Sequence, residues 1–441
     1  MRKQVLFVLT FLATIPFLLG QTTRNVPTGT YPNIASAVAA AVDGDIIQIA
    51  GGMTVTESGI LVNKNLTFRG GGQNSTIVQG HASPNMAPTR IFQITTGKTV
   101  RFEKMTIRHG YARTSASSGP NSGGGAIDCN QCTLSVEDVT FKDNRCLTTA
   151  NLNGGAIVIQ AQVGGPTNVF NRCRFEGNRV GESNTNPDGG AIQVFGAANG
   201  ADLLVDSCVF ANNYAGDLGG AFYAGSNNFL TTFTNSYFLN NQAADDAGAV
   251  GLSDFSITAC TFEGNTCTDE GGAVRTNSSR DQTITNSTFY NNSGGTGGAI
   301  KIRINSPGSM TLTNTTVYNN YAFSRGGGLY IEDSSPNAGP VNLINNIMVG
   351  NNVGPGDIDI ENDGIIGTNS TNMVEGCTGT CPSFAGSILQ GVGPYGDNGG
   401  FTKTLALLNT SNAINVGTTT GAPAEDQRGY LRIGNPDLGA Y

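Results

Sequence analysis

The chain has 441 residues, and only 13% of them are charged. Its formal net charge is −8, which disfavours a nucleic-acid partner, because phosphate binding needs a basic face. The 62 glycines and the absence of tryptophan are poor material for helices and are typical of short strands joined by tight turns. The composition therefore favours a protein built from many short strands.

The first 20 residues are expected to be a secretory signal peptide. A basic start, Arg2 and Lys3, precedes an almost wholly apolar run from Val5 to Leu19. This run is too short for a typical membrane-spanning helix, and its flanks fit a signal that is removed near Gly20. No later apolar run is long enough to span a membrane. We therefore expect a mature chain that has no transmembrane segment and is secreted or held at the cell surface.

Residues 21–110 are expected to form an N-terminal cap and the first, irregular coils of a larger stack. Ile34, Val38 and Ala41 would lie on one face of a short helix, which ends before the run Asp-Gly-Asp. Such a cap would protect the first strand from edge-to-edge pairing. Short strand-like segments follow it, and His109 after the last of them is interpreted as a turn residue.

Residues 111–350 repeat one phrase, F-x-x-N followed six to twelve residues later by G-G-A and an Ile, Val or Phe, with some degenerate copies. The period is 24 to 35 residues, which indicates a solenoid whose units bury their apolar faces only by stacking. The second glycines of the phrase are Gly125, Gly155, Gly190, Gly220, Gly248, Gly272, Gly298 and Gly327.

Two or three short strands fit into each repeat, with no room for a helix. Residues 203–210 alternate apolar or small side chains with polar ones, and residues 157–159 form a second type of strand after the glycines. The pattern predicts a parallel β-helix, in which equivalent residues stack about 4.8 Å apart. Phenylalanines should then fill the lumen, and asparagines should form a hydrogen-bonded ladder. The glycine pairs should allow a tight turn and a close approach of neighbouring coils.

Nine cysteines occur, and most of them follow the repeat. At two positions of the repeat, cysteine alternates with Ala, Val, Ser and Thr, which is typical of a small buried residue. Cys377 and Cys381 lie outside the repeats and are the best candidates for a disulfide. The repeat cysteines are Cys146, Cys173, Cys208, Cys260 and Cys267.

The repeat resembles that of the polymorphic outer-membrane proteins and of related right-handed β-helix proteins with the pectin-lyase-like fold. Residues 34–47 resemble the opening of such chains. Asp397–Leu408, Asp426–Gly429 and Pro436–Tyr441 resemble the choice-of-anchor Q domain of bacterial surface proteins. The resemblance implies an exported bacterial right-handed, single-stranded β-helix, often followed by a surface-sorting tail. No such tail follows Tyr441, which leaves the route of attachment open.

Residues 351–441 are assigned to the terminal coils and to this choice-of-anchor Q-like region. The repeat decays here into sequence rich in Gly, Asn and Thr. We expect this region to close the second end of the stack.

The candidate substrate-binding residues lie on outward strand positions. Side chains alternate along a strand, so the residue after G-G-A-[IVF] faces outward. Arg275, Lys301 and Arg303 would lie on neighbouring coils, flanked by Tyr223 and Tyr330. Basic and aromatic groups on a flat, ridged face would suit an acidic polysaccharide. The alternative is a solvated face with scattered charges, and no cluster of Asp or Glu is evident on it.

Two acidic pairs lie at matching positions in the turns before the glycines, Asp245 with Asp246 and Asp269 with Glu270. Carboxylate oxygens are suitable ligands for Ca²⁺, so the pairs are candidate calcium ligands. The preferred interpretation is that they simply solubilise the turn.

No catalytic residue is assigned, because the sequence has no metal-ligand motif, nucleophile elbow or phosphate loop. The first hypothesis is a non-catalytic cell-surface or extracellular protein, adhesin-like or glycan-binding, with a polysaccharide or a host or neighbouring cell surface as its partner. The alternative is a polysaccharide lyase or hydrolase that contacts an acidic glycan through Arg275, Lys301 and Arg303. A structural spacer is the third possibility.

Overall fold

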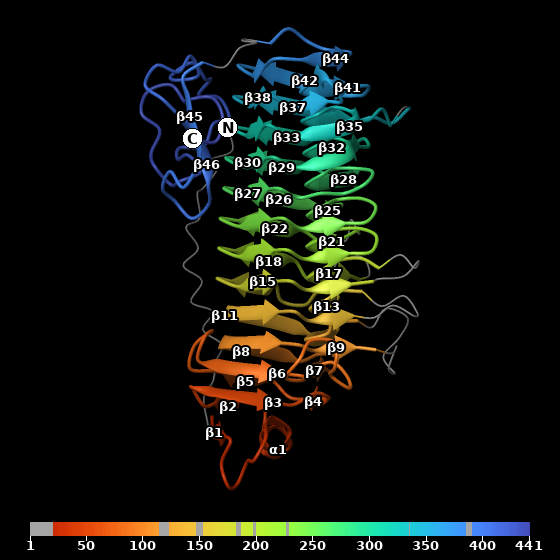
Figure 1. The fold of residues 1–441 in the computed structure, drawn as a ribbon, viewed down its shortest axis with the longest axis vertical. Helices are drawn as coiled ribbons and strands as arrows, with labels where there is room; N and C mark the ends of the chain where they lie inside the picture. The colour runs from red at the N-terminus through yellow and green to blue at the C-terminus, as the bar shows by residue number, and fades with distance from the viewer. Residues whose placement is uncertain are drawn as a thin grey trace.

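The computed structural model shows a tall stack of β-strand coils, with one short helix at the N-terminal end (Figure 1). Almost all strand pairs are parallel, which confirms the predicted all-β parallel β-helix. The predicted signal peptide, residues 1–20, lies outside the described residues. The structure describes residues 21–113, 123–146, 153–181, 187–196, 200–225, 229–334, 336–384 and 390–441.

Helix α1 (Ile34–Ala40) caps the first coil. The Asn33 side chain accepts a hydrogen bond from the Ser36 backbone, and the Ser36 hydroxyl accepts one from the Asn33 backbone. At the other end of the helix, Lys64 donates to two carbonyl groups. The predicted capping helix is therefore confirmed, and the residues that it buries are Ile34, Ala37 and Val38.

The largest sheet, sheet A, has 23 strands and forms one wall of the stack. Its strands are β1 (Thr23–Val26), β2 (Ile46–Ile49), β3 (Met53–Thr56), β5 (Leu66–Arg69), β6 (Thr76–Gln79), β8 (Thr99–Arg108), β11 (Thr133–Lys142), β14 (Asn168–Asn171), β15 (Arg174–Glu176), β18 (Leu203–Asp206), β19 (Val209–Ala211), β22 (Thr231–Thr234), β23 (Tyr237–Leu239), β26 (Phe255–Thr258), β27 (Thr261–Glu263), β29 (Gln282–Thr285), β30 (Thr288–Tyr290), β33 (Met310–Thr313), β34 (Thr316–Tyr318), β37 (Pro340–Ile344), β38 (Ile347–Val349), β42 (Ile365–Ser370) and β43 (Met373–Val374).

Sheet B has 12 parallel strands and contains the segments that follow the glycine pairs. In Figure 1 it lies to the right of sheet A. Its strands are β4 (Ile60–Val62), β7 (Phe92–Ile94), β10 (Ile127–Asn130), β13 (Ile157–Gln160), β17 (Ile192–Phe195), β21 (Phe222–Ala224), β25 (Val250–Leu252), β28 (Val274–Ser278), β32 (Ile300–Ile304), β36 (Leu329–Ile331), β41 (Ile360–Asn362) and β44 (Cys377–Gly379).

Short strands between sheets A and B form a five-stranded and a four-stranded sheet, together called sheet C. Bridges through Thr266 connect the two parts. The strands are β9 (Tyr111–Ala112), β12 (Arg145–Cys146), β16 (Arg179–Val180), β20 (Tyr214–Ala215) and β24 (Gln242–Ala243), then β31 (Ser293–Thr296), β35 (Tyr321–Arg325), β39 (Asn352–Val353) and β40 (Gly356–Asp357).

Residues with positive φ bend each coil at fixed positions. One such residue separates the two strands that each regular coil gives to sheet A, for example Asn286 with φ 46°. A second lies five residues later, directly before the ladder asparagine, for example Asn291 with φ 54°. In the regular coils this second residue is Asp, Asn or Gly, which tolerate the left-handed region best. The bend is therefore encoded inside the F-x-x-N phrase.

The two glycines of the phrase have different functions. Gly271 has φ +72°, which disfavours most other residues. A Cβ on Gly272 would lie 2.0 Å from the Gly298 carbonyl oxygen of the next coil. The first glycine therefore permits the turn, and the second permits the close approach of coils, as predicted.

The predicted phenylalanine stack fills the lumen. Consecutive rings from Phe141 to Phe289 are stacked with centroids 4.6 to 4.9 Å apart. Each pair contributes roughly 0.5–1.5 kcal/mol beyond the burial of its area. The rings in this stack are Phe141, Phe175, Phe210, Phe238, Phe262 and Phe289.

The predicted asparagine ladder is also present, from Asn144 to Asn351. Each side chain donates to the side-chain oxygen of the next asparagine, at 2.8 to 3.1 Å, and to a carbonyl of the preceding coil. The ladder ends on Asp359, which accepts from Asn351 at 2.8 Å. Burial raises the pKa of Asp359 to about 6.

The cysteine predictions agree with the structure. The five repeat cysteines are free and buried, and Cys377 forms a disulfide with Cys381. A second disulfide, between Cys129 and Cys132, was not predicted.

The second end of the molecule follows the expectation only in part. The coils continue through β44 to Gly379, Phe384 packs against the core at this end, and residues 392–441 lie along the outside of sheet A. Figure 1 shows this flanking segment, residues 392–441, to the left of sheet A, with the antiparallel strands β45 (Val392–Gly396) and β46 (Thr404–Leu407). We call it the C-terminal flank.

One buried glutamine and a column of asparagines hold the C-terminal flank. Gln427 donates to the Thr261 hydroxyl at 2.7 Å and accepts from the Thr288 hydroxyl at 2.7 Å. Tyr395 stacks on Tyr290 with ring centroids 3.9 Å apart. The strand-corner residues Asn286, Asn314 and Asn345 each donate to a backbone carbonyl of the flank.

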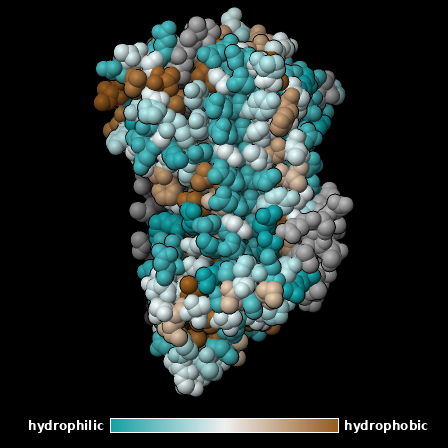
Figure 2. Space-filling view, in the orientation of Figure 1, coloured by the Kyte–Doolittle hydropathy of each residue, from teal (hydrophilic) through white to brown (hydrophobic). Residues whose placement is uncertain are grey.

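The outer surface of the C-terminal flank is apolar in part. Figure 2 shows an apolar patch at the upper left, over this segment, beside a mostly hydrophilic surface on the coils. Of the large apolar side chains in the described residues, the two most exposed are Ile433 (88%) and Leu431 (71%).

Candidate functional site

The candidate site lies where the turns before the glycine pairs meet sheet B, and we call these turns the turn edge. In several of these turns, one side chain accepts a hydrogen bond from a backbone N–H group of the next turn along the stack. The Asp188 carboxylate accepts from the Leu218 backbone at 3.3 Å, and the Asp246 carboxylate accepts from the Glu270 backbone at 2.9 Å. This requirement for an acceptor explains why acidic residues recur directly before the glycines. The turn carboxylates of the regular coils are Asp188, Asp217, Asp245, Asp246, Asp269 and Glu270.

The outward positions of sheet B form one row, as the sequence predicted. Pairing places Tyr223 beside Gly251, Gly251 beside Arg275, Arg275 beside Lys301 and Lys301 beside Tyr330. Arg303 lies two residues along β32, opposite Asn277.

The cations of this row are paired with carboxylates. Arg275 Nε lies 2.8 Å from Glu270 Oε2 and 3.3 Å from Asp246 Oδ2. Lys301 is only 1% exposed and contacts both Glu270, at 2.9 Å, and Glu332. The expectation of a face without an acidic cluster is therefore wrong. The interpretation of scattered solvated charges also fails for Lys301, because the turn carboxylates fold back over the strand that follows them.

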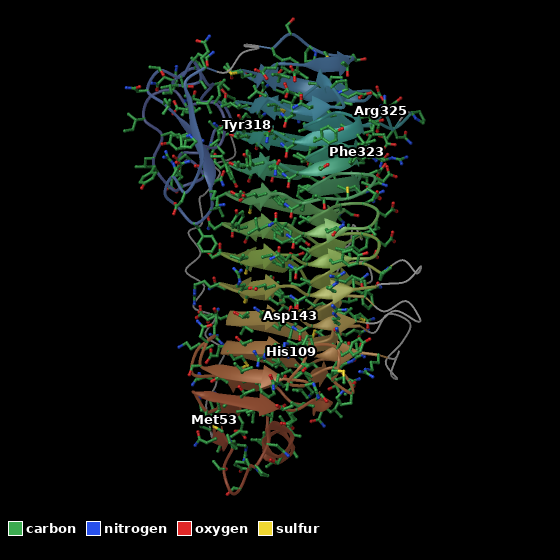
Figure 3. The ribbon with its side chains drawn as sticks, viewed as in Figure 1. Met53, His109, Asp143, Tyr318, Phe323 and Arg325 are labelled. Carbon is green, nitrogen blue, oxygen red and sulfur yellow. A yellow bond between two sulfur atoms is a disulfide. The ribbon has the colours of Figure 1, made fainter. Side chains whose placement is uncertain are left out.

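Tyr330 and Arg303 differ in accessibility. Tyr330 is buried at 7% exposure, and its hydroxyl accepts from Arg325 at 2.6 Å and donates to Asp363 at 3.2 Å. Figure 3 shows Arg325 with Phe323 at the upper right, on the side away from the C-terminal flank. Arg303 is the most exposed of the three predicted cations, with 43% of its side chain accessible and Glu332 at 3.9 Å. Tyr330 thus has a packing role in the described structure.

The turn carboxylates have unequal proton affinities. Burial and the neighbouring Asp217 raise the pKa of Asp188 to about 7. Burial also raises the pKa of Asp246 to about 6, although Arg275 opposes this. For Glu270 the burial cost is outweighed by Lys301 and Arg275, so its pKa lies below its usual value. The edge therefore holds protonated and ionised carboxyl groups side by side near neutral pH.

Tyr223 lies among these groups. Burial and then the charge of Asp188 raise the pKa of Tyr223 to about 12, with smaller effects of Arg275, Asp217 and Asp246. Its hydroxyl therefore stays protonated at physiological pH.

Three of the four candidate calcium ligands come together. Asp245, Asp246 and Asp269 each offer one oxygen within 4.8 Å of the others. Glu270 is not part of this group, because its carboxylate contacts Arg275 and Lys301.

Sequence reasoning missed Asp188 and Asp217. Asp188 directly precedes a glycine pair, as Glu270 does, and Asp217 lies two residues before one, as Asp269 does. Aligning every turn on its glycines would have found both residues. Their effect on each other and on Tyr223 depends on the stacking of three coils, which spacing alone does not describe.

The two histidines lie elsewhere, in early coils. His109 has φ 56°, which confirms the turn assignment. Figure 3 places His109 next to Asp143 of the following coil, and their side chains lie 4.0 Å apart. Burial lowers the pKa of His109, so its imidazole is neutral at neutral pH.

Comparisons with known proteins concern the fold. Residues 191–378 match the family model described as "Right handed beta helix region". A search of curated proteins finds no match. Within the described residues, no helix has the length and apolar character needed to cross a bilayer.

Three solved structures illustrate the similarity. Geobacillus virus E2 ORF18 is 14% identical with TM-score 0.43, over 67% of this chain and 57% of that one. A PL6 family alginate lyase is 14% identical with TM-score 0.45, over 95% and 57%. A pectin methylesterase is 15% identical with TM-score 0.29, over 57% and 79%. The chain thus spans little more than half the length of two of these proteins. Together with its parallel sheets, the family match identifies a right-handed β-helix.

Proposed function

We propose that the chain is an exported polysaccharide hydrolase that uses Asp188 and Asp246 on the turn edge as its acid and base. One observation carries this proposal. The two carboxyl groups occupy the same position of the turn, two coils apart, on either side of the coil that contains Tyr223.

The two-coil separation suits hydrolysis with inversion. Coils stack about 4.8 Å apart, so equivalent positions two coils apart are separated by roughly 10 Å. Inverting glycosidases hold their carboxyl groups about 6.5–9.5 Å apart, which leaves room for the attacking water. Asp188 leans toward the coil of Tyr223 and Asp246 leans toward Glu270 of the following coil, so the separation of the pair stays near the upper end of this range. Carboxyl groups on adjacent coils would leave no such room.

The proton affinities assign the roles. Because the pKa of Asp188 is about 7 and that of Asp246 about 6, Asp188 is mostly protonated and Asp246 mostly ionised between these values. Asp188 donates its proton to the glycosidic oxygen as the bond to the sugar carbon breaks. Asp246 accepts a proton from the water that attacks this carbon from the opposite side. The activity should therefore peak between about pH 6 and 7.

The experiment is a hydrolysis assay on a panel of neutral and acidic polysaccharides, with detection of new reducing ends. We expect Asp188→Asn and Asp246→Asn each to lose about 10²–10⁴-fold in rate. The control Asp397→Asn, at an exposed position of the C-terminal flank, should retain full activity. A rate that is unchanged in both test variants would refute the assignment.

Hydrolysis is favoured over the lyase alternative. A lyase that removes a proton from a uronate needs a basic side chain and free positive charge to hold the uronate carboxylate. Here Arg275 and Lys301 already bind Glu270, and Arg275 also contacts Asp246. We therefore expect no unsaturated product from uronic-acid polymers.

A non-catalytic, adhesin-like or glycan-binding function is the second candidate, with a polysaccharide or a host or neighbouring cell surface as partner. The structural use of the same groups favours it, since Asp188 and Asp246 each cap a neighbouring turn. Binding to a glycan with no product from any polymer of the panel would favour this function over hydrolysis.

We also propose that Ca²⁺ can bind the carboxylates of Asp245, Asp246 and Asp269. This binding would compete with the use of Asp246 as the catalytic base. Since Asp246 must lose its proton to bind a cation, the affinity for Ca²⁺ should fall as pH decreases through about 6. Calorimetric titration with Ca²⁺ at pH 7.5 and pH 5 tests this. The absence of binding heat at both values, with no change in thermal stability, would exclude the cation.

Export is also part of the proposal. Two disulfides, Cys129–Cys132 and Cys377–Cys381, support an oxidising compartment. Mass spectrometry of the protein purified from culture medium should show a mature chain that begins close to residue 21. Recovery of the full-length chain from the cytoplasm only would contradict export.

A further inference from the structure

The Tyr223 ring lies flat on sheet B, over two glycines. A Cβ on Gly251, in the next coil, would lie 2.8 Å from Tyr223 Cδ2. A Cβ on Gly225, two residues along the same strand direction, would lie 2.3 Å from the Tyr223 hydroxyl oxygen. One edge of the ring and its hydroxyl end thus occupy the space that Cβ atoms at positions 251 and 225 would need. Tyr223 is intermediate in exposure, so part of its side chain remains accessible.

We infer that Tyr223 is a stacking platform for a sugar ring, and that the bound polysaccharide is neutral rather than a polyuronate. This inference specifies the substrate class of the proposed function. It rests on that function only for the position of the glycosidic bond that is cleaved. A flat, partly exposed aromatic ring offers a large apolar area at little cost in conformational entropy. The C–H face of a sugar ring can pack on such an area.

The charge around the platform excludes a polyanion. Carboxyl groups outnumber cations near Tyr223, and the nearest cation, Arg275, is shared by two carboxylates. A uronate would bring further negative charge to a surface of the same sign, which costs binding energy. The inference therefore differs from the expectation of an acidic glycan. The carboxyl groups of this face are Asp188, Asp217, Asp245, Asp246, Asp269, Glu270 and Glu332, and its cations are Arg275, Lys301 and Arg303.

A second, independent feature lies beside the platform. Gln193 pairs with Tyr223 in the row, is only 5% exposed, and its Oε1 has no hydrogen-bond partner among the described residues. A buried acceptor without a donor is costly, and a ligand hydroxyl would satisfy it. A carboxylate would not, because it is itself an acceptor. Gln193 therefore favours a hydroxyl-rich neutral chain as well.

Binding is measured in the full chain carrying Asp188→Asn, so that hydrolysis does not remove the ligand. The probes are laminarin, pullulan, galactomannan and xylan as neutral polymers, and polygalacturonate and alginate as acidic ones, in affinity electrophoresis. We expect retardation by at least one neutral polymer and by neither acidic one. Tyr223→Ala should weaken this binding roughly tenfold or more, whereas Tyr223→Phe should keep it.

Gly251→Ala tests the position of the ring rather than its chemistry. The added methyl group forces the ring away from the sheet without strain in the backbone, because Gly251 does not have positive φ. We expect it to weaken binding like Tyr223→Ala. Gly396→Ala, where a Cβ meets nothing within 4 Å, is the matched control and should bind normally. Circular dichroism confirms the fold of each variant, and Tyr223→Ala decides the test if Gly251→Ala does not fold.

Preference for an acidic polymer, no binding to any polymer of the panel, or unchanged binding in Tyr223→Ala would each overturn the inference. The outcomes are separable from those of the proposed function. Neutral-polymer binding through Tyr223 without hydrolysis by the unmodified protein refutes only the hydrolase. Hydrolysis of a polyuronate refutes only the neutral platform.

Discussion

The regular coils and the C-terminal flank are stabilised in different ways. In the coils, each contact is repeated, so that a phenylalanine meets a phenylalanine and an asparagine meets an asparagine on every level. In the flank, contacts such as those between Gln427 and three threonine hydroxyls occur once, and only the asparagine column that holds it is repeated. Periodic contacts can be read from a sequence, because each copy confirms the others. Single contacts between residues far apart in the chain leave no such pattern.

The largest effect is expected from Gly272→Val, which attacks the spacing of the coils. The new side chain would start 2.0 Å from a backbone oxygen of the next coil, and a backbone cannot move aside as a flexible side chain can. We expect loss of the cooperative fold, measured as the absence of a thermal transition and of soluble protein. Normal expression with an unchanged melting temperature would contradict the role of the second glycine.

Phe262→Ala should have the next largest effect, about 3–5 kcal/mol in the free energy of unfolding. The ring is fully buried and stacked between Phe238 and Phe289, so its removal leaves a cavity. Chemical denaturation measures the change. Phe401→Ala in the flank, where the ring is 52% exposed, is the control and should cost less than about 1 kcal/mol. Equal effects of the two substitutions would erase the distinction between the regions.

The pH dependence of stability should come from the turn edge of the coils. The pKa of Asp246 is raised to about 6 in the folded chain, so between about pH 4 and 6 the folded state binds more protons than the unfolded state. Stability must then fall as pH rises through this window, by at most about 3 kcal/mol from this group.

The variant Asp246→Asn should flatten the slope of unfolding free energy against pH. Denaturation at pH 4.5, 5.5, 6.5 and 7.5 in both proteins gives the comparison. Parallel slopes would show that Asp246 does not carry the raised pKa.

Gln427→Ala should loosen the flank and leave the coils intact. It leaves the buried Thr288 hydroxyl without its acceptor, at a cost of about 1–3 kcal/mol, whereas the Thr261 hydroxyl still donates to the Lys403 carbonyl. Limited proteolysis and hydrogen exchange should show faster cleavage and exchange in residues 392–441 only. Simultaneous loss of protection throughout the coils would mean that the two regions unfold as one unit.

The smallest effect is expected from Cys208→Ser, below about 1 kcal/mol. Ser236 holds the same position in the next coil, and the Cys208 backbone already donates to the Ser236 hydroxyl at 3.2 Å. Chemical denaturation under reducing conditions checks this value. A loss comparable to that of Phe262→Ala would show that the position requires sulfur rather than a small side chain.

The sequence was sufficient for the repeat positions and for the row on sheet B. Phe262, Asn265 and Gly272 could be assigned because their neighbours along the stack are copies of themselves. Arg275, Lys301 and Arg303 could be placed on one face because strand periodicity is 2. Their ion pairs could not be predicted in this way, because Glu270 and Arg275 lie on different parts of one bent coil. The contacts of Gln427 with sheet A could not be predicted either, because more than a hundred residues separate it from its partners in the sequence.

By itself, the sequence determined a parallel β-helix with a capping helix, a phenylalanine core, an asparagine ladder and an acidic turn edge. These follow from the period of the repeat and from the backbone needs of glycine and asparagine. Only the tertiary structure decided that the turn carboxylates neutralise the cations of sheet B, that Tyr223 lies flat, and that the last residues return along the flank. The reason is that burial and charge depend on distances in space, which a one-dimensional repeat describes only where neighbouring coils are alike.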